Sequence, residues 1–310
     1  MIEVQNLIKN YGNIQAVKNI SFTVNKNEVL GFLGPNGAGK STTMNMIVGY
    51  LPMTSGTIKI NGIDISENPK EAKKNIGYLP EIPPLYPDMK VIEYLKFVAG
   101  IKGIKKQDRA FQIDRAMSRL KITDKKNRVI KNLSKGYKQR VGFAQALLGD
   151  PKVIILDEPT VGLDPSQTKE VRDLIKKLGK DHTIIFSSHI LSEVNAVADR
   201  ILIINNGEIK AQDTTNNLEV DRNEVILKLD IEGDKNKTSE VLKSIDGFID
   251  ILDTVEVSDG VYSYKVSVAD DSVRKSIVSK LTLEDLSIVE ITTMKRSLED
   301  VFLDVTSKKD

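Results

Sequence analysis

A glycine-rich stretch that ends in lysine and serine, "GPNGAGKS" at residues 34–41, limits the folds open to this chain more than any other feature. It has the spacing Gly34-x4-Gly39-Lys40-Ser41, follows an apolar run typical of a strand and precedes a helical pattern. Backbone N–H groups of such a loop can surround a phosphate, and the helix start adds partial positive charge. The stretch therefore predicts a P-loop, in which Lys40 reaches the β- and γ-phosphates of a nucleotide and Ser41 binds Mg²⁺. The alternative is an ordinary glycine turn.

A second motif, "VIILDEPT" at residues 153–160, has an apolar strand pattern that ends in two carboxylates. Asp157 is predicted to hold the Mg²⁺ shell. Glu158 can orient or deprotonate a water in line with the γ-phosphate, so it is the candidate general base. The alternative is that both are solvated acids at the end of a strand.

The remaining pattern of the first two thirds predicts an α/β fold. Runs rich in valine and isoleucine predict strands buried on both faces of a parallel sheet, at residues 28–34, 153–159 and 183–189. Helical patterns lie between them, at residues 40–51, 91–100, 108–120 and 166–179. Residues 1–12 and 16–25 alternate as in a flanking antiparallel sheet. Residues 79–88 contain four prolines and predict a rigid loop.

The last third follows a different pattern and predicts a second domain. The predicted elements are a strand at 224–231, a helix at 238–245, two strands at 253–268 around Asp259-Gly260, a helix at 271–281 and a strand at 286–293. A final helix is predicted at 297–307. The order βαββαβ is that of a ferredoxin-like domain. The boundary is expected near residues 212–220, which gives domains 1–215 and 216–310.

Composition narrows the classes of function. The net charge of +2 hides an asymmetry, because residues 1–217 carry +10 and residues 218–310 carry −8. A basic first part suits polyphosphates or an anionic membrane surface, although two ordinary solvated surfaces would look the same. The absence of cysteine excludes disulfides and thiolate chemistry, and two histidines make a histidine metal cluster unexpected. No run approaches the roughly 18 apolar residues of a membrane span, and no basic run interleaved with aromatics indicates nucleic-acid binding.

Five motifs together carry a family resemblance: "GPNGAGKST", "LSKGYKQR" at 133–140, "VIILDEPT", "GLDP" at 162–165 and "SSH" ending at residue 189. In this order and spacing, residues 1 to about 212 resemble the ATP-binding subunit of an ABC transporter. The resemblance implies a P-loop ABC ATPase domain, with a mixed sheet, a flanking antiparallel sheet and a helical subdomain. Together with the last third, the expected fold class is α/β with a small C-terminal α+β ferredoxin-like domain.

The resemblance also implies a dimer. In ABC ATPases the signature motif closes over the nucleotide held by a second subunit, which assigns Ser134 and Gly136 to the partner's ATP. A serine hydroxyl and the start of a helix can hold a γ-phosphate in any case. Asp164 resembles the residue that couples the two sites, and it also suits the N-cap of the helix after Pro165.

Further site residues follow from the same match. Tyr11 resembles the aromatic that stacks on adenine, although an isolated tyrosine is more often ordinary surface. His189 resembles the switch histidine at the γ-phosphate, and a structural histidine is the alternative. Glu81 stands at the position of the Gln loop and can bind Mg²⁺. The complete set assigned to nucleotide contact in the P-loop is Gly34, Asn36, Gly37, Ala38, Gly39, Lys40, Ser41 and Thr42.

Three positions depart from the usual family pattern. Lys135 replaces the first glycine of LSGGQ, Tyr137 replaces its glutamine, and Glu81 replaces the glutamine of the Gln loop. These changes resemble the drug-exporter and gliding-motility branch, whose members pair with ABC-2-type permeases. Loss of activity is the alternative. The tail at 297–308 resembles the same branch, and the C-terminal domain is expected to be structural or regulatory.

The implied function is ATP hydrolysis that powers a separate integral membrane permease, from the cytoplasmic face of the membrane. Catalysis falls to Glu158, His189 and Lys40, the cofactors are ATP and Mg²⁺, and the metal is assigned to Ser41, Glu81 and Asp157. The partners are the permease and a second copy of the chain or a paralogous ATPase, with no nucleic acid. One alternative is an ABC ATPase acting on ribosomes or DNA, and another is a catalytically weak nucleotide-dependent switch.

Overall fold

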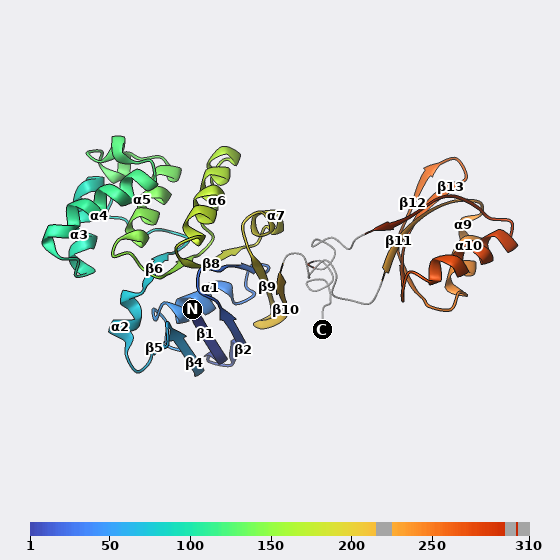
Figure 1. The fold of residues 1–310 in the computed structure, drawn as a ribbon, viewed down its shortest axis with the longest axis horizontal. Coiled ribbons are helices and arrows are strands. Elements are labelled where there is room, and N and C mark those ends of the chain that lie inside the picture. The colour runs from blue at the N-terminus through green and yellow to red at the C-terminus, as the bar shows by residue number, and fades with distance from the viewer. Residues whose placement is uncertain (215–224, 295–301, 303–310) are drawn as a thin grey trace. The chain divides into compact units, whose positions relative to one another are not determined.

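The computed structural model describes residues 1–214, residues 225–294 and Phe302 (Figure 1). These residues form two compact units, one from residues 1–214 with Phe302 and the other from residues 225–294. Each unit has a hydrophobic core of its own. The helix predicted at 297–307 lies outside the described residues, apart from Phe302.

A six-stranded sheet with the strand order β10-β9-β3-β8-β7-β6 forms the centre of the first unit. Strands β9, β3, β8, β7 and β6 are parallel, and β10 pairs antiparallel with β9. The strands are β3 (Val29–Leu33), β6 (Ile76–Leu79), β7 (Val153–Leu156), β8 (Thr183–Ser188), β9 (Arg200–Asn205) and β10 (Glu208–Thr214). Every residue of β3, β7 and β8 is buried, which confirms the three predicted buried strands.

A second, antiparallel sheet with the order β2-β1-β4-β5 packs in the same core, as predicted for the N-terminal residues. Its strands are β1 (Ile2–Tyr11), β2 (Ile14–Val24), β4 (Ser55–Ile60) and β5 (Ile63–Asp64). The ring centroids of Phe22 and Phe32, one from each sheet, are 5.7 Å apart. The shared core also contains residues of helix α1 (Lys40–Ile47).

The other helices of this unit confirm the predicted ranges 91–100, 108–120 and 166–179, and they include two short helices, at 69–74 and 191–195, that the sequence did not predict. They are α2 (Pro69–Lys74), α3 (Val91–Ile101), α4 (Lys106–Arg119), α5 (Lys135–Leu147), α6 (Pro165–Gly179) and α7 (Leu191–Asn195), with 3₁₀ turns η1 (Thr123–Lys125) and η2 (Ile130–Asn132). Helix α1 is shorter than the predicted range 40–51, because Gly49 adopts a left-handed φ of 67° just after the C-cap residue. Residues 80–88 form neither helix nor strand, as the prolines predict.

A half-buried lysine joins the ends of α3 and α5. The Lys102 amine, just after α3, donates to the carbonyls of Gln145, Ala146 and Leu148 at 3.1, 3.2 and 2.7 Å. These carbonyls lie at the end of α5, where helix geometry leaves carbonyls short of intrahelical donors, although that of Gln145 also accepts from the backbone N–H of Leu148 at 3.3 Å. Burial lowers the pKa of Lys102 to about 8. The Tyr94 hydroxyl of α3 also donates to the side chain of Gln145, so the two helices are held at two points.

The second unit is a βαββαβ domain, in the predicted order. Its elements are β11 (Val225–Glu232), α9 (Lys235–Lys243), β12 (Phe248–Ser258), β13 (Val261–Val268), α10 (Val273–Leu283) and β14 (Ser287–Met294). The sheet is antiparallel with the order β12-β13-β11-β14, which is ferredoxin-like. Residues of α9 and α10 share one core with the strands.

The separate core of the second unit predicts a local effect of mutation. Leu229, on the central strand β11, is fully buried in this core. Replacing Leu229 with alanine leaves a cavity and is expected to cost about 2–5 kcal/mol of unfolding free energy in this unit. Chemical denaturation followed by hydrogen exchange should place the loss in residues 225–294. A comparable loss of protection in the first unit would contradict the independence of the two cores.

Candidate functional site

The glycine-rich loop lies between the end of β3 and the start of α1, as its sequence context predicts. A Cβ atom on Gly34 would lie 2.2 Å from the carbonyl oxygen of Ile204, so no other residue fits there. Gly39 has a φ of 103°, a conformation that favours glycine, and forms the N-cap of α1. The loop therefore presents its backbone at the N-terminus of a buried helix, where an anion is stabilised.

Lys40, the first residue of α1, is held inside this loop. Its side chain is only 6% exposed, and its amine donates to the carbonyls of Gly34 at 2.8 Å and Pro35 at 3.1 Å. The amine also lies 3.6 Å from Oε1 of Glu158. The positive charge of Lys40 therefore lies beside the part of the loop where an anion is stabilised.

Three elements meet at Asp157, which follows β7 directly. Oδ1 of Asp157 accepts hydrogen bonds from the hydroxyl of Ser41 on α1 at 3.1 Å and from that of Ser187 on β8 at 2.7 Å. The Ser187 hydroxyl in turn accepts from the backbone N–H of Glu158 at 2.8 Å. The carboxyl ends of parallel strands meet at one edge of the sheet, which explains the meeting of these groups.

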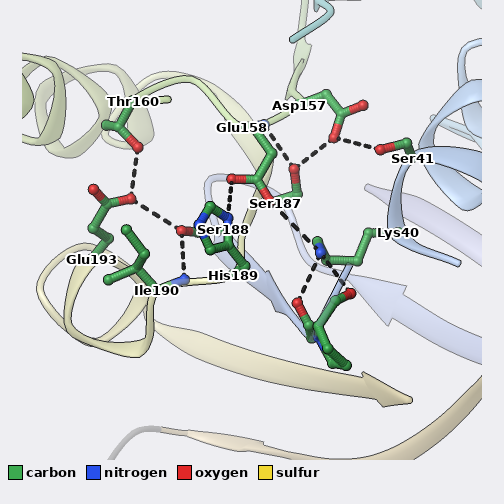
Figure 2. Close-up of polar contacts among 12 residues, drawn as sticks. Lys40, Ser41, Asp157, Glu158, Thr160, Ser187, Ser188, His189, Ile190 and Glu193 are labelled. Atoms are coloured by element: carbon green, nitrogen blue, oxygen red, sulfur yellow. Dashed lines mark hydrogen bonds and ion pairs between the residues drawn. The ribbon is translucent and has the colours of Figure 1, made fainter. Parts of the chain in front are cut away.

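Glu158 stands at the centre of the polar contacts in Figure 2. Its side chain is buried and its backbone has a φ of 46°, which is rare for a residue other than glycine. Oε2 lies 2.9 Å from Nδ1 of His189, while Oε1 faces Lys40. The structure thus brings together the three residues predicted to be catalytic.

A neighbouring tyrosine keeps its proton. The Tyr78 hydroxyl on β6 donates to Oδ1 of Asn45 at 3.0 Å. Burial, and secondly the nearby Asp157 carboxylate, raise the pKa of Tyr78 well above its ordinary value. The phenol therefore adds no negative charge beside the carboxylates.

The glycine-rich loop, Glu158 and His189 border a cavity of about 430 Å³. The predicted site residues that line it are Asn36, Gly37, Gly39, Lys40, Ser41, Thr42, Glu81, Glu158 and His189, together with Ala16 and Val161. Gly34 and Ala38 belong to the same loop without lining the cavity, and Asp157 is joined to it through Ser41. The side chains of Ser41 and Asp157 offer the oxygen ligands that Mg²⁺ prefers.

Besides Gly34, Ala38 and Asp157, four predicted residues do not line this cavity. Tyr11 is 47% exposed, with the Lys9 amine 5.1 Å from its ring centroid. Ser134 is the N-cap of α5 and accepts from the backbone N–H of Tyr137 at 3.4 Å, and Gly136 is buried in the first turn of that helix. Asp164 is the N-cap of α6, as its sequence context allows. The chain does not bring Ser134, Gly136 or Asp164 to its own cavity.

The two departures in "LSKGY" have structural partners within the chain. The Lys135 side chain lies over Gly162, where an added Cβ would be 1.9 Å from the lysine Nζ. The ring of Tyr137 has the Lys125 amine 5.2 Å and the Arg140 guanidinium 6.0 Å from its centroid. Cations at these distances from an aromatic face are attracted to it. Both substitutions are thus accommodated at the start of α5.

Sequence reasoning missed four polar residues that support the site, namely Thr160, Ser187, Ser188 and Glu193. The two serines carried a signal, because hydroxyl groups that end an otherwise apolar buried strand need hydrogen-bond partners. Thr160 and Glu193 carried no local signal, since they are 33 residues apart in the sequence.

The fold and this site define a P-loop protein that binds nucleoside triphosphates, because a glycine loop between strand and helix faces an Asp-Glu pair that directly follows a parallel strand. Residues 17–161 match the model of the ABC transporter family. The uncharacterised ABC transporter ATP-binding protein YhcH of Bacillus subtilis (strain 168) is 34% identical over 99% of this chain and 96% of its own. The chain belongs to the ABC transporter family.

Other similarities extend the comparison. The bacitracin transport ATP-binding protein BcrA of Bacillus licheniformis is 35% identical over 98% of this chain and 96% of its own. The dimeric structure of an ATP-binding cassette in a post-hydrolysis state, bound to ADP and Pi, has a TM-score of 0.63 and 25% identity, covering 69% of this chain and 98% of that one. No helix in the described residues has the length and apolar character required to cross a bilayer.

Proposed function

We propose that this chain hydrolyses ATP in the cavity at the glycine-rich loop, with Glu158 as general base, and thereby powers export by a separate membrane permease. The observation that carries the catalytic part is the position of Glu158, whose buried carboxylate contacts both Lys40 and His189 beside the loop. Family membership as an ATP-binding ABC protein makes ATP the substrate.

Each part of the cavity has a task in phosphoryl transfer, which requires mainly positioning and neutralisation of charge. The loop backbone and Lys40 hold the β- and γ-phosphates. The oxygens of Ser41 and Asp157 would hold Mg²⁺, with Glu81 also lining the cavity, and the ion would neutralise phosphate charge. Tyr11 is assigned to the adenine ring, at the exposed edge of the same unit.

Glu158 activates the attacking water. In the structure Lys40 pairs with Oε1 of Glu158, and phosphate oxygens compete for the same amine. Once the amine turns to the phosphates, Oε1 is free to accept a proton from water. His189 keeps its contact with Oε2, orients the carboxylate and faces the γ-phosphate. The water oxygen then attacks phosphorus as the bond to the ADP oxygen breaks.

The complete site is assigned to two copies of the chain. Ser134 and Gly136 begin a helix with no acidic residue in its first turn, yet they lie away from their own cavity. A helix start of this kind suits the γ-phosphate of ATP held by another copy. Asp164, at the start of α6, is assigned to the contact between the two sites.

A size-exclusion experiment tests the two-copy site. The Glu158→Gln variant with ATP and Mg²⁺ is expected to elute as a dimer, and without nucleotide as a monomer. Adding Ser134→Arg should restore the monomer even with ATP, because the bulky cation blocks the helix start. ATP binding by the double variant, measured by calorimetry, should persist. A dimer that survives Ser134→Arg, or that forms without ATP, would contradict the assignment.

The surface that contacts the permease is assigned to residues 82–101, which follow Glu81. Large apolar side chains are exposed along residues 82–101, among them Ile82 and Ile101, and Tyr86 packs against Phe97 with centroids 5.3 Å apart. Such side chains suit a protein partner better than water. Similarity to the bacitracin transport protein BcrA over nearly the full chain supports a permease that exports, and a position on the cytoplasmic face of the membrane.

A further inference from the structure

Two turns carry Glu158 and His189, which act together in the proposed mechanism. One turn follows β7 and begins at Glu158, where the backbone N–H of Val161 donates to the Glu158 carbonyl at 3.2 Å. The other follows β8 and contains His189. Nδ1 of His189 lies 2.9 Å from Oε2 of Glu158, and this contact depends on how the two turns are placed relative to each other.

A single carboxylate oxygen connects these turns. Oε2 of Glu193, on α7, accepts from the Thr160 hydroxyl at 2.6 Å and from the Ser188 hydroxyl at 3.0 Å (Figure 2). Thr160 lies two residues after Glu158, and Ser188 directly precedes His189. Thr160 and Ser188 are 7% and 1% exposed, so water has little access to either hydroxyl.

The contact at Ser188 also fixes the backbone around the histidine. The Ser188 hydroxyl accepts from the backbone N–H of Ile190 at 3.0 Å while it donates to Glu193. Ser188 and Ile190 thus close a short turn around His189. The hydrogen bond to Glu193 holds the Ser188 hydroxyl that makes this contact. Because one oxygen serves both turns, a shift of either turn is coupled to the other.

We propose that Glu193 is a positioning residue for hydrolysis, which holds the turn of His189 against the turn of Glu158. This inference rests on the proposed function. Glu193 does not line the cavity, so it acts through the two turns and not on the nucleotide. Loss of its carboxylate leaves two enclosed hydroxyls without their acceptor and releases the turns from each other.

The expected effect is a loss of turnover without a loss of binding. Displacement of catalytic groups by about 1 Å costs on the order of 100-fold in rate. Glu193→Leu is therefore expected to lower kcat by about 10- to 100-fold while the KM for ATP stays within about twofold. Glu193→Gln keeps an oxygen that can accept from both hydroxyls, so it should restore most of the turnover.

The test is the steady-state ATPase activity of the full chain, with Asn195→Leu as a control at an exposed position on the same helix. Each variant is also made in a His189→Ala background. Because Glu193 acts partly through His189, Glu193→Leu should reduce kcat much less in that background than alone. Thr160→Val and Ser188→Ala, which remove one hydrogen bond each, should give intermediate losses and serve if Glu193→Leu does not fold.

The outcomes separate this inference from the proposed function. If the unmodified chain, assayed with its permease, is no more active than Glu158→Gln, the proposed function fails. If the unmodified chain is active, three results overturn the role of Glu193: a raised KM at constant kcat, equal effects with and without His189, or a glutamine variant as slow as the leucine variant.

Discussion

Replacing Glu158 with glutamine is expected to abolish steady-state ATP hydrolysis while ATP still binds. Glutamine has nearly the same shape but cannot accept a proton from water. General-base catalysis contributes about 10²- to 10⁴-fold in rate, so kcat should fall by at least about 100-fold. The variant also loses the negative charge that faces the Lys40 amine at 3.6 Å, which leaves this amine free for the phosphates. Phosphate release measures the first effect and calorimetry with ATP the second.

Two comparisons make the Glu158 experiment decisive. Glu193→Gln changes the same functional group on an element that does not line the cavity, and it should retain most of the turnover. Glu81→Gln alters a cavity wall and should change the dependence on Mg²⁺ more than kcat. If the unmodified chain, assayed with its permease, hydrolysed ATP no faster than Glu158→Gln, the chain would be a nucleotide-dependent switch and the general-base assignment would be wrong.

Replacing Lys40 with alanine is expected to remove nucleotide binding. Its amine is the buried cation within the loop, and charge-assisted hydrogen bonds are worth about 1.5–3 kcal/mol each. Loss of contacts to two phosphates should therefore weaken the affinity for ATP by roughly 100-fold or more. The affinity can be followed with a fluorescent ATP analogue, and turnover at saturating ATP should fall as well.

The structure also indicates how the Lys40 variant can be interpreted. The Lys40 amine donates to the carbonyls of Gly34 and Pro35, so its loss also removes two contacts that hold the loop. Lys40→Arg keeps the charge but not the fit in the loop, and should bind ATP weakly. Lys59→Ala, at an exposed position on β4, removes the same charge elsewhere and should bind normally. Normal affinity in Lys40→Ala would contradict the assignment of this cavity to the phosphates.

The sequence predicted the parts of the site whose geometry is local. The order strand, glycine loop and helix fixes where Lys40 and Ser41 lie, and a carboxylate pair after a buried strand must emerge at the sheet edge that faces them. Apolar runs rich in valine and isoleucine likewise predicted the parallel strands β3, β7 and β8, and the pattern of the last third predicted the βαββαβ order. In each case a repeating pattern or a short motif determines the structure by itself.

The sequence could not predict what depends on contacts between distant segments. Strand β10 was missed because Glu208–Thr214 is largely polar and is defined by its pairing with β9. Helix α7 was missed because five residues are too few for a periodic pattern. Glu193 was missed because its two hydroxyl partners, Thr160 and Ser188, follow or end different strands. Only folding shows that one oxygen serves both.

The joint between α3 and α5 has a mechanical consequence. Lys102 and Tyr94 connect the C-terminal end of α5 to α3, and Ser134 lies at the N-terminus of α5. Thirteen helical residues extend about 20 Å with little bending. We therefore expect a displacement of α3 to be transmitted along α5 to Ser134, so that contact at one end of this helix pair changes the position of the other.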